Sequence, residues 1–121
     1  MSTATTFDLT ELGKKGQKAS RTLATLPTAK KDEALQAMAD ELMARSDEVL
    51  EANAEDIEDA RAEGMDEALV DRLLLTEERV EKLADSLRQV TELADPVGSE
   101  LESRVLPNGM RLSKRRIPIG V

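Results

Sequence analysis

The sequence contains no cysteine, histidine, tryptophan or tyrosine, and Phe7 is its only aromatic residue. The absence of cysteine excludes disulfide bonds, a thiol nucleophile and thiolate metal ligands. The absence of histidine removes the side chain most often used as a general base at neutral pH, so a Ser-His-Asp triad or an H-E-x-x-H zinc site cannot form. We therefore assign no catalytic, cofactor-binding or metal-binding residue within these 121 residues.

The charge balance is acidic, with 25 Asp and Glu against 17 Lys and Arg, a formal charge of −8. A nucleic-acid partner is not expected, because such a partner needs a basic surface. The longest apolar run, residues 73–75, is far shorter than the ~20 residues of a membrane span, and the amino terminus has no signal-peptide pattern. The expectation is a cytoplasmic protein without a membrane partner.

Leucine and alanine supply most of the apolar residues. A core without aromatic side chains buries little apolar area for a chain of this length, because aromatic residues usually contribute much of the buried area. Two interpretations follow. The chain is a simple helical bundle, or its helices pack against something outside the 121 residues.

Apolar residues at helical spacing predict five helices, at about 7–25, 29–45, 46–63, 65–75 and 77–93. Four polar residues are predicted to cap helix amino termini: Thr28, Ser46, Asp66 and Thr76. Gly64 is predicted to end the third helix in a left-handed conformation. The fifth helix has the cleanest apolar stripe, which is predicted to face the core: Val80, Leu83, Ala84, Leu87, Val90 and Ala94.

Two charged runs admit a functional interpretation. The acids of residues 51–63 could be imagined as metal ligands, but no compact ligand spacing stands out, so a solvated helix face is favoured. The basic run 114–116 could contact phosphate, but the overall negative charge favours a solvated strand edge.

The helical spacing of apolar residues stops at residues 95–98. Residues 103–106 and 110–113 flank Pro107-Asn108-Gly109, which is typical of a β-hairpin with a type I turn and a left-handed bulge at Gly109. This register places Leu106 opposite Met110, with Leu112 on the same face. The chain then stops within an apolar, β-branched run at 117–121, so we expect a truncated chain that leads into a missing sheet.

Several stretches resemble a known family. They include Asp-Arg-Leu-Leu-Leu-Thr at 71–76, Asp-Pro-Val-Gly at 95–98, Leu-Pro-Asn-Gly at 106–109 and Arg-Ile-Pro-Ile-Gly-Val at 116–121. On these motifs the chain resembles the amino-terminal part of the γ-glutamyl phosphate reductases, or glutamate-5-semialdehyde dehydrogenases, of the aldehyde dehydrogenase superfamily. The resemblance covers nearly all of this chain but only the opening part of the family's chain.

The resemblance implies an oxidoreductase of proline biosynthesis. The whole enzyme would use NADPH to reduce L-glutamate 5-phosphate to L-glutamate 5-semialdehyde with release of phosphate, through a covalent intermediate on a cysteine. No position here matches that cysteine or a glycine-rich phosphate loop, so no catalytic or cofactor residue is carried over. The chain alone is expected to be inactive.

The resemblance also implies the fold, an α/β aldehyde dehydrogenase-like protein of which this chain is the mainly α-helical beginning. Residues 1–98 would be the helical part of the cofactor-binding domain, 99–116 the β-hairpin of the oligomerisation arm, and 117–121 the start of the first strand of a Rossmann-like sheet. The hairpin would join a homo-oligomer, and an exposed strand edge independently favours a partner there. The candidate interface residues are Val105, Leu106, Met110 and Leu112.

Two other interpretations stay open. The chain could be a stand-alone acidic helical interaction module, which its charge, its amphipathic helices and its lack of catalytic groups favour. It could also be part of a general aldehyde dehydrogenase relative that acts on another substrate.

Overall fold

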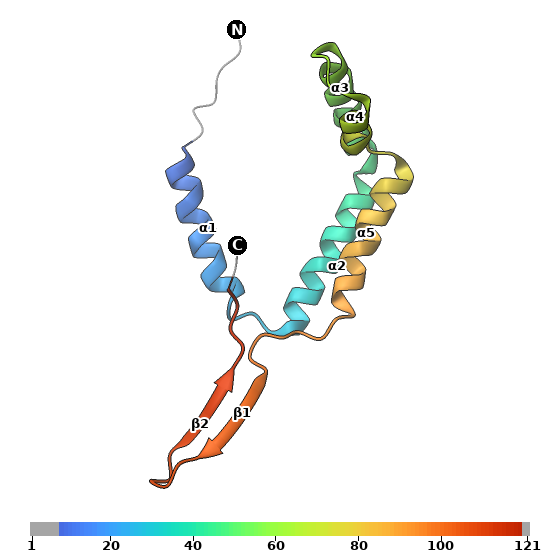
Figure 1. The fold of residues 1–121 in the computed structure, drawn as a ribbon. Coiled ribbons are helices and arrows are strands. Elements are labelled where there is room, and N and C mark those ends of the chain that lie inside the picture. The colour runs from blue at the N-terminus through green and yellow to red at the C-terminus, as the bar shows by residue number, and fades with distance from the viewer. Residues whose placement is uncertain (1–7, 120–121) are drawn as a thin grey trace. The chain divides into compact units, whose positions relative to one another are not determined.

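The computed structural model describes residues 8–119, in which five helices precede a two-stranded antiparallel sheet (Figure 1). This confirms the predicted order of elements. Phe7, Gly120 and Val121 lie outside the described residues, so the predicted helix start at 7 and the end of the predicted strand at 117–121 do too. The elements are α1 (Leu9–Leu23), α2 (Thr28–Ala44), α3 (Ser46–Ala62), α4 (Glu67–Leu73), α5 (Glu77–Thr91), β1 (Glu100–Val105) and β2 (Arg111–Arg115).

The chain divides into two compact units. Residues 29–94 form a helical unit that contains nearly all of α2 and the whole of α3, α4 and α5, whereas residues 1–28 and 95–121 form a unit with α1 and the hairpin. We describe each unit by itself.

Helix α1 is capped but has no buried side chain. The Asp8 carboxylate accepts hydrogen bonds from the backbone N–H groups of Thr10 (2.9 Å) and Glu11 (3.2 Å), which satisfies two amino-terminal donors. The apolar residues Leu9 and Leu12 are exposed. The predicted helix is therefore confirmed, but its apolar side is uncovered.

Two predicted caps are wrong. Thr28 is the first residue of α2, and its hydroxyl donates a hydrogen bond of 2.8 Å to the Asp95 carboxylate. Ser46 is the first residue of α3, because α2 runs to Ala44 and leaves a single residue, Arg45, between the two helices. Arg45 is the N-cap residue of α3, but its side chain makes no capping hydrogen bond. It is the single residue at the joint between α2 and α3.

The other predicted helix ends are confirmed. Gly64 has φ +81°, and the N–H groups of Gly64 and Met65 donate to the carbonyls of Arg61 (3.0 Å) and Ala60 (2.9 Å), a Schellman motif. At the helix amino termini, the Asp66 carboxylate caps α4 and the Thr76 hydroxyl caps α5.

The buried core of the described residues lies in the helical unit. Only part of the predicted stripe of α5 belongs to it: Val80 and Ala84 are fully buried and Leu87 is half-buried, but Leu83 and Val90 are 49% and 48% exposed. Each helix of the helical unit buries between one and three residues, and α1 in the other unit buries none. The buried apolar side chains are Ala39, Ile57, Ala60, Val70, Val80 and Ala84.

Asn53 is the one buried polar side chain of the described residues, with 7% exposure. It lies on α3, and its amide donates to the Leu73 carbonyl (2.9 Å) and accepts from the Leu75 N–H (2.7 Å). Leu73 is the last residue of α4, and Leu75 lies in the link between α4 and α5. The Asn53 amide therefore ties α3 to this link, and no buried side-chain nitrogen or oxygen of the described residues lacks a hydrogen-bond partner.

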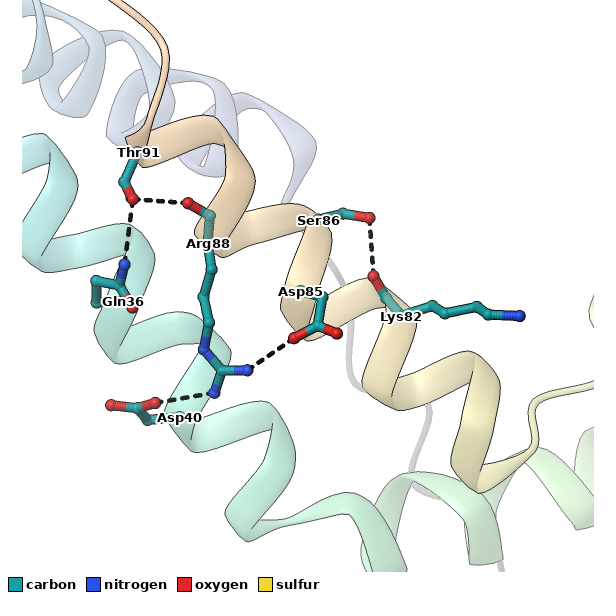
Figure 2. A network of polar contacts seen from close by, with 7 residues as sticks. All are labelled: Gln36, Asp40, Lys82, Asp85, Ser86, Arg88 and Thr91. Atoms are coloured by element: carbon teal, nitrogen blue, oxygen red, sulfur yellow. Dashed lines mark hydrogen bonds and ion pairs between the residues drawn. The ribbon is translucent and has the colours of Figure 1, made fainter.

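Polar side chains join α2 to α5, which lie side by side (Figures 1 and 2). The Arg88 guanidinium contacts the Asp40 carboxylate (3.2 Å) and the Asp85 carboxylate (3.1 Å), and the Gln36 amide donates to the Thr91 hydroxyl (3.1 Å). Hydrogen bonds to the two carboxylates raise the pKa of Arg88, so it stays charged. These contacts fix the pairing of the two helices.

We predict that Asn53→Ala loosens the helical unit, because it leaves the Leu73 carbonyl and the Leu75 N–H without their partner. The free energy of local opening should fall by ~1–3 kcal/mol, the usual cost of an unsatisfied buried polar group. Amide hydrogen exchange at Leu75 measures this. The control Asn108→Ala removes an exposed asparagine of the hairpin turn and should leave exchange at Leu75 unchanged; equal effects of the two substitutions would refute the prediction.

Candidate functional site

A hollow of the helical unit lies at the joint between α2 and α3. Its volume is about 950 Å³. Its lining combines apolar side chains with three carboxylates and one guanidinium. We call this surface the α2–α3 concavity; its lining is Ala37, Met38, Glu41, Leu42, Arg45, Glu48, Val49, Ala52, Asn53, Asp56 and Leu75.

Arg45 at the joint bridges the two helices electrostatically. Its guanidinium lies 2.6 Å from the Glu48 carboxylate of α3 and 3.6 Å from the Glu41 carboxylate of α2. The hydrogen bonds and charge of Glu48 raise the pKa of Arg45, and the same contacts hold the pKa of the Glu48 carboxyl below its usual value. Since all three side chains are exposed, the bridge orients the joint more than it stabilises it.

The hairpin has the predicted turn. The Gly109 N–H donates to the Leu106 carbonyl (2.8 Å) and Gly109 has φ +87°, as a type I turn followed by a left-handed bulge requires. The Leu106 N–H in turn donates to the Met110 carbonyl (2.8 Å), which confirms that these two residues are opposite each other.

The four candidate interface residues do not share a face. Arg104 pairs with Leu112 and Val105 pairs with Arg111, and successive residues of a strand alternate between faces. Leu106, Met110 and Leu112 therefore lie on one face and Val105 on the other. The assignment of all four residues to an oligomer interface stays a prediction, and the alternation of the strand places Val105 on the opposite face from its neighbour Leu106.

The two units carry opposite charge. Residues 29–94 contain 20 carboxylates and 8 cationic side chains, a net charge of −12, whereas the other unit contains 5 and 9, a net charge of +4. Most cations of the helical unit are paired with its own carboxylates, such as Arg61 with Glu67 and Lys82 with Glu78. The overall charge of −8 thus conceals a basic part and a strongly acidic part.

The acids of residues 51–63 lie mostly exposed along α3. Among residues 8–119, no three carboxylates converge as metal ligands would. Nor does any helix within that range have the length and apolarity to cross a membrane.

The residues present do not fit a nicotinamide cofactor. Nucleotide phosphates are commonly held where a glycine-rich turn leads from a strand into a helix. In the described part of the chain both strands follow the last helix, so no strand leads into a helix. The glycines with positive φ there end a helix or form turns; they are Gly64, Gly98 and Gly109. We therefore assign no residue of this chain to such a cofactor.

Sequence reasoning missed Arg45 and Asn53. A signal for Asn53 was present, because it occupies a buried position of α3 in helical spacing with Ile57 and Ala60. A polar residue within such a stripe indicates a buried hydrogen-bonding role. Arg45 had no comparable signal, since its role depends on where α2 ends.

No family model matches the chain. Curated relatives do match it. The chain is 56% identical over 115 residues to the "Gamma-glutamyl phosphate reductase" of Photobacterium profundum and 54% identical to that of Vibrio cholerae. Each match covers 95% of this chain, and this chain spans 28% of the relatives' length.

A solved structure has the same fold over this region. It is the crystal structure of the γ-glutamyl phosphate reductase from Thermotoga maritima, with a TM-score of 0.89 and 38% sequence identity. The likeness covers 93% of this chain and 27% of that protein.

We predict that Arg45→Ala raises the pKa of the Glu48 carboxyl toward its ordinary value, because the substitution removes the hydrogen bonds and the positive charge that lower it. A carboxyl whose pKa is lowered by folding stabilises the fold above its unfolded pKa. That contribution is lost as the pH falls through the lowered value. Carbon-detected NMR titration of the glutamate carboxyls measures the change. Arg61→Ala, which removes the partner of Glu67, should leave Glu48 unaffected; an unchanged Glu48 pKa in Arg45→Ala contradicts the account.

Proposed function

We propose, from the homology of 95% of this chain to γ-glutamyl phosphate reductase, that it is the amino-terminal part of such a reductase. The observation that carries the proposal is identity of more than half the residues along nearly the whole chain. The fold shared with the Thermotoga maritima enzyme at 38% identity supports it.

In this proposal the whole protein reduces L-glutamate 5-phosphate to L-glutamate 5-semialdehyde with NADPH and releases phosphate, a step of proline biosynthesis in the cytoplasm. The nicotinamide would supply the hydride, and a cysteine would carry the acyl group. The 121 residues contain no cysteine, and residues 8–119 form no phosphate loop that would hold the nucleotide, so we place neither function in this chain. The role of this chain is therefore structural.

The proposed structural role has two parts. Residues 1–98 would form the helical part of the cofactor-binding domain, and residues 99–116 would form an arm that joins subunits of a homo-oligomer, with residues 117–121 starting the first strand of the sheet. Support comes from exposed apolar side chains in both units, such as Leu9 (74%) and Ile117 (77%) in one unit and Met38 (55%) in the helical unit. Apolar patches of this kind usually mark surfaces that another part covers.

A second candidate is an acidic interaction module. It is favoured by the helical unit, which has its own buried residues, helix caps and the Asn53 hydrogen bonds. Such a unit could hold its fold without further chain.

We predict that the 121-residue chain does not oxidise NADPH in the presence of L-glutamate 5-phosphate, because it lacks the cysteine nucleophile. Loss of absorbance of the reduced nicotinamide measures this, with a full-length relative as the positive control. Turnover above the buffer background would overturn the proposal that the chain is inert. A stop codon directly after Val121 in an intact gene would speak against a longer parent.

We also predict that the isolated chain binds the dye ANS and melts with a broad transition, since its apolar faces lack their cover. Near-ultraviolet circular dichroism offers little signal without tryptophan and tyrosine, so far-ultraviolet melting and dispersion of methyl NMR signals are the measurements. A sharp cooperative melt without ANS binding would instead favour the stand-alone module.

A further inference from the structure

The chain contains two asparagines, and the fold places them in opposite surroundings. Asn53 lies on α3 with 7% exposure, and both its amide nitrogen and its amide oxygen are hydrogen-bonded to backbone groups. Asn108 lies exposed at the tip of the hairpin and is followed by Gly109. The backbone nitrogen of the next residue can attack an asparagine side chain, so these surroundings decide which of the two is reactive.

The turn holds the Asn108 carboxamide in place through its oxygen. The side-chain oxygen Oδ1 accepts a hydrogen bond of 3.1 Å from the Met110 N–H. When a nucleophile adds to the Cγ atom of a carboxamide, negative charge develops on this oxygen. A backbone N–H that already points at the oxygen stabilises that charge, as the donors of an oxyanion hole do. The Met110 N–H therefore orients the Asn108 side chain and favours attack on its Cγ.

The nucleophile is the backbone nitrogen of Gly109. A Cβ placed on Gly109 would meet no heavy atom within 4 Å beyond the chain neighbours, so the space around this residue is open. Because Gly109 has no side chain, it also offers the least steric hindrance to closure of a ring with Asn108. Its N–H donates to the Leu106 carbonyl (2.8 Å), and this hydrogen bond has to open before the nitrogen can attack.

The hydrogen bond from Gly109 to Leu106 belongs to a hairpin with little support. The described sheet has two strands, and every residue of β1 and β2 is exposed. A two-stranded hairpin by itself is marginally stable in water, so its turn opens often. The attack is then intramolecular, which favours it strongly over attack by a solvent molecule.

Asn53 has none of these features. Its carboxamide is held by the Leu73 carbonyl and the Leu75 N–H, and the next residue, Ala54, lies within α3 and carries a Cβ. Attack at Asn53 would require the helix and both side-chain hydrogen bonds to open together. The two asparagines therefore form a matched pair within one chain.

We propose that Asn108 is a site of spontaneous deamidation, which converts it into a mixture of isoaspartate and aspartate. The Gly109 N–H gives its proton to a solvent base, and the nitrogen forms a bond to the Asn108 Cγ. The bond from Cγ to Nδ2 breaks, and Nδ2 leaves as ammonia. Water then opens the resulting cyclic imide at either carbonyl. Water is consumed and ammonia released, so no oxidant or reductant is needed.

The isoaspartate product changes the hairpin. When water opens the imide at the main-chain carbonyl of Asn108, the chain runs through Cβ and Cγ and gains a methylene group within the turn. Turn length and geometry set the register of a hairpin, so the pairing of Leu106 with Met110 should be lost. The aspartate product adds a negative charge but keeps the backbone. This inference goes beyond the proposed reductase function and does not depend on it.

The test is incubation of the 121-residue chain in mildly alkaline buffer, followed by peptide mapping with liquid chromatography and mass spectrometry. We expect Asn108 to be converted at least about tenfold faster than Asn53, because a buried group is exposed by local opening far less often than a turn of an isolated hairpin. Both isoaspartate and aspartate should form at position 108. Equal rates at the two asparagines, or aspartate without isoaspartate, overturns the proposal.

Asn108→Gln is the matched control for ring closure, because it keeps an exposed carboxamide at the same position but requires a larger ring. We expect this variant to release ammonia from position 108 at least about tenfold more slowly, since the reacting atoms are less well placed. An equal rate would mean direct hydrolysis by water and would refute the cyclic imide.

Asn108→Asp is the control for charge, because it carries the new carboxylate on an unchanged backbone. Amide hydrogen exchange at Leu106, whose N–H donates to the Met110 carbonyl, reports the register. Protection there should persist in Asn108→Asp and be lost in the isoaspartate form purified from the incubated chain. Equal protection in the two forms contradicts the proposed effect on the hairpin.

Discussion

The fold of the helical unit depends on one buried amide. Asn53 offers a donor and an acceptor to the Leu73 carbonyl and the Leu75 N–H, two backbone groups that no helix satisfies. The Arg79 guanidinium of α5 also donates to the carbonyls of Asp71 in α4 and Leu74 in the link. With this link fixed, α5 returns alongside α2, and the side chains of Arg88 and Gln36 can join them.

The helical unit depends on these polar contacts because its buried apolar core is small. The buried apolar side chains are alanines, valines and one isoleucine, without any aromatic residue. Such a core gives little specificity of packing, so directed hydrogen bonds decide which segments meet. Many larger apolar residues are exposed instead, among them Met38 in the α2–α3 concavity and Met110 and Leu112 on the hairpin.

The sequence predicted the helix ends and the turn that depend only on residues close together in the chain. The Asp66 and Thr76 caps, the glycine end of α3 and the turn at Pro107-Asn108-Gly109 each depend on residues a few positions apart, and each is confirmed. The predicted caps at Thr28 and Ser46 were wrong, because each helix begins one residue earlier than a cap at that position allows. Both residues are the first residues of their helices instead.

The sequence by itself determined the order of elements, the hairpin register and the lack of cysteine and histidine chemistry, because these depend on residue type and near neighbours. It also carries the homology to γ-glutamyl phosphate reductase. Only the tertiary structure decided which half of each apolar stripe is buried, that Asn53 joins α3 to a distant link, and that a single residue between α2 and α3 creates a concavity. Those outcomes depend on contacts between residues far apart in the chain, which periodicity does not encode.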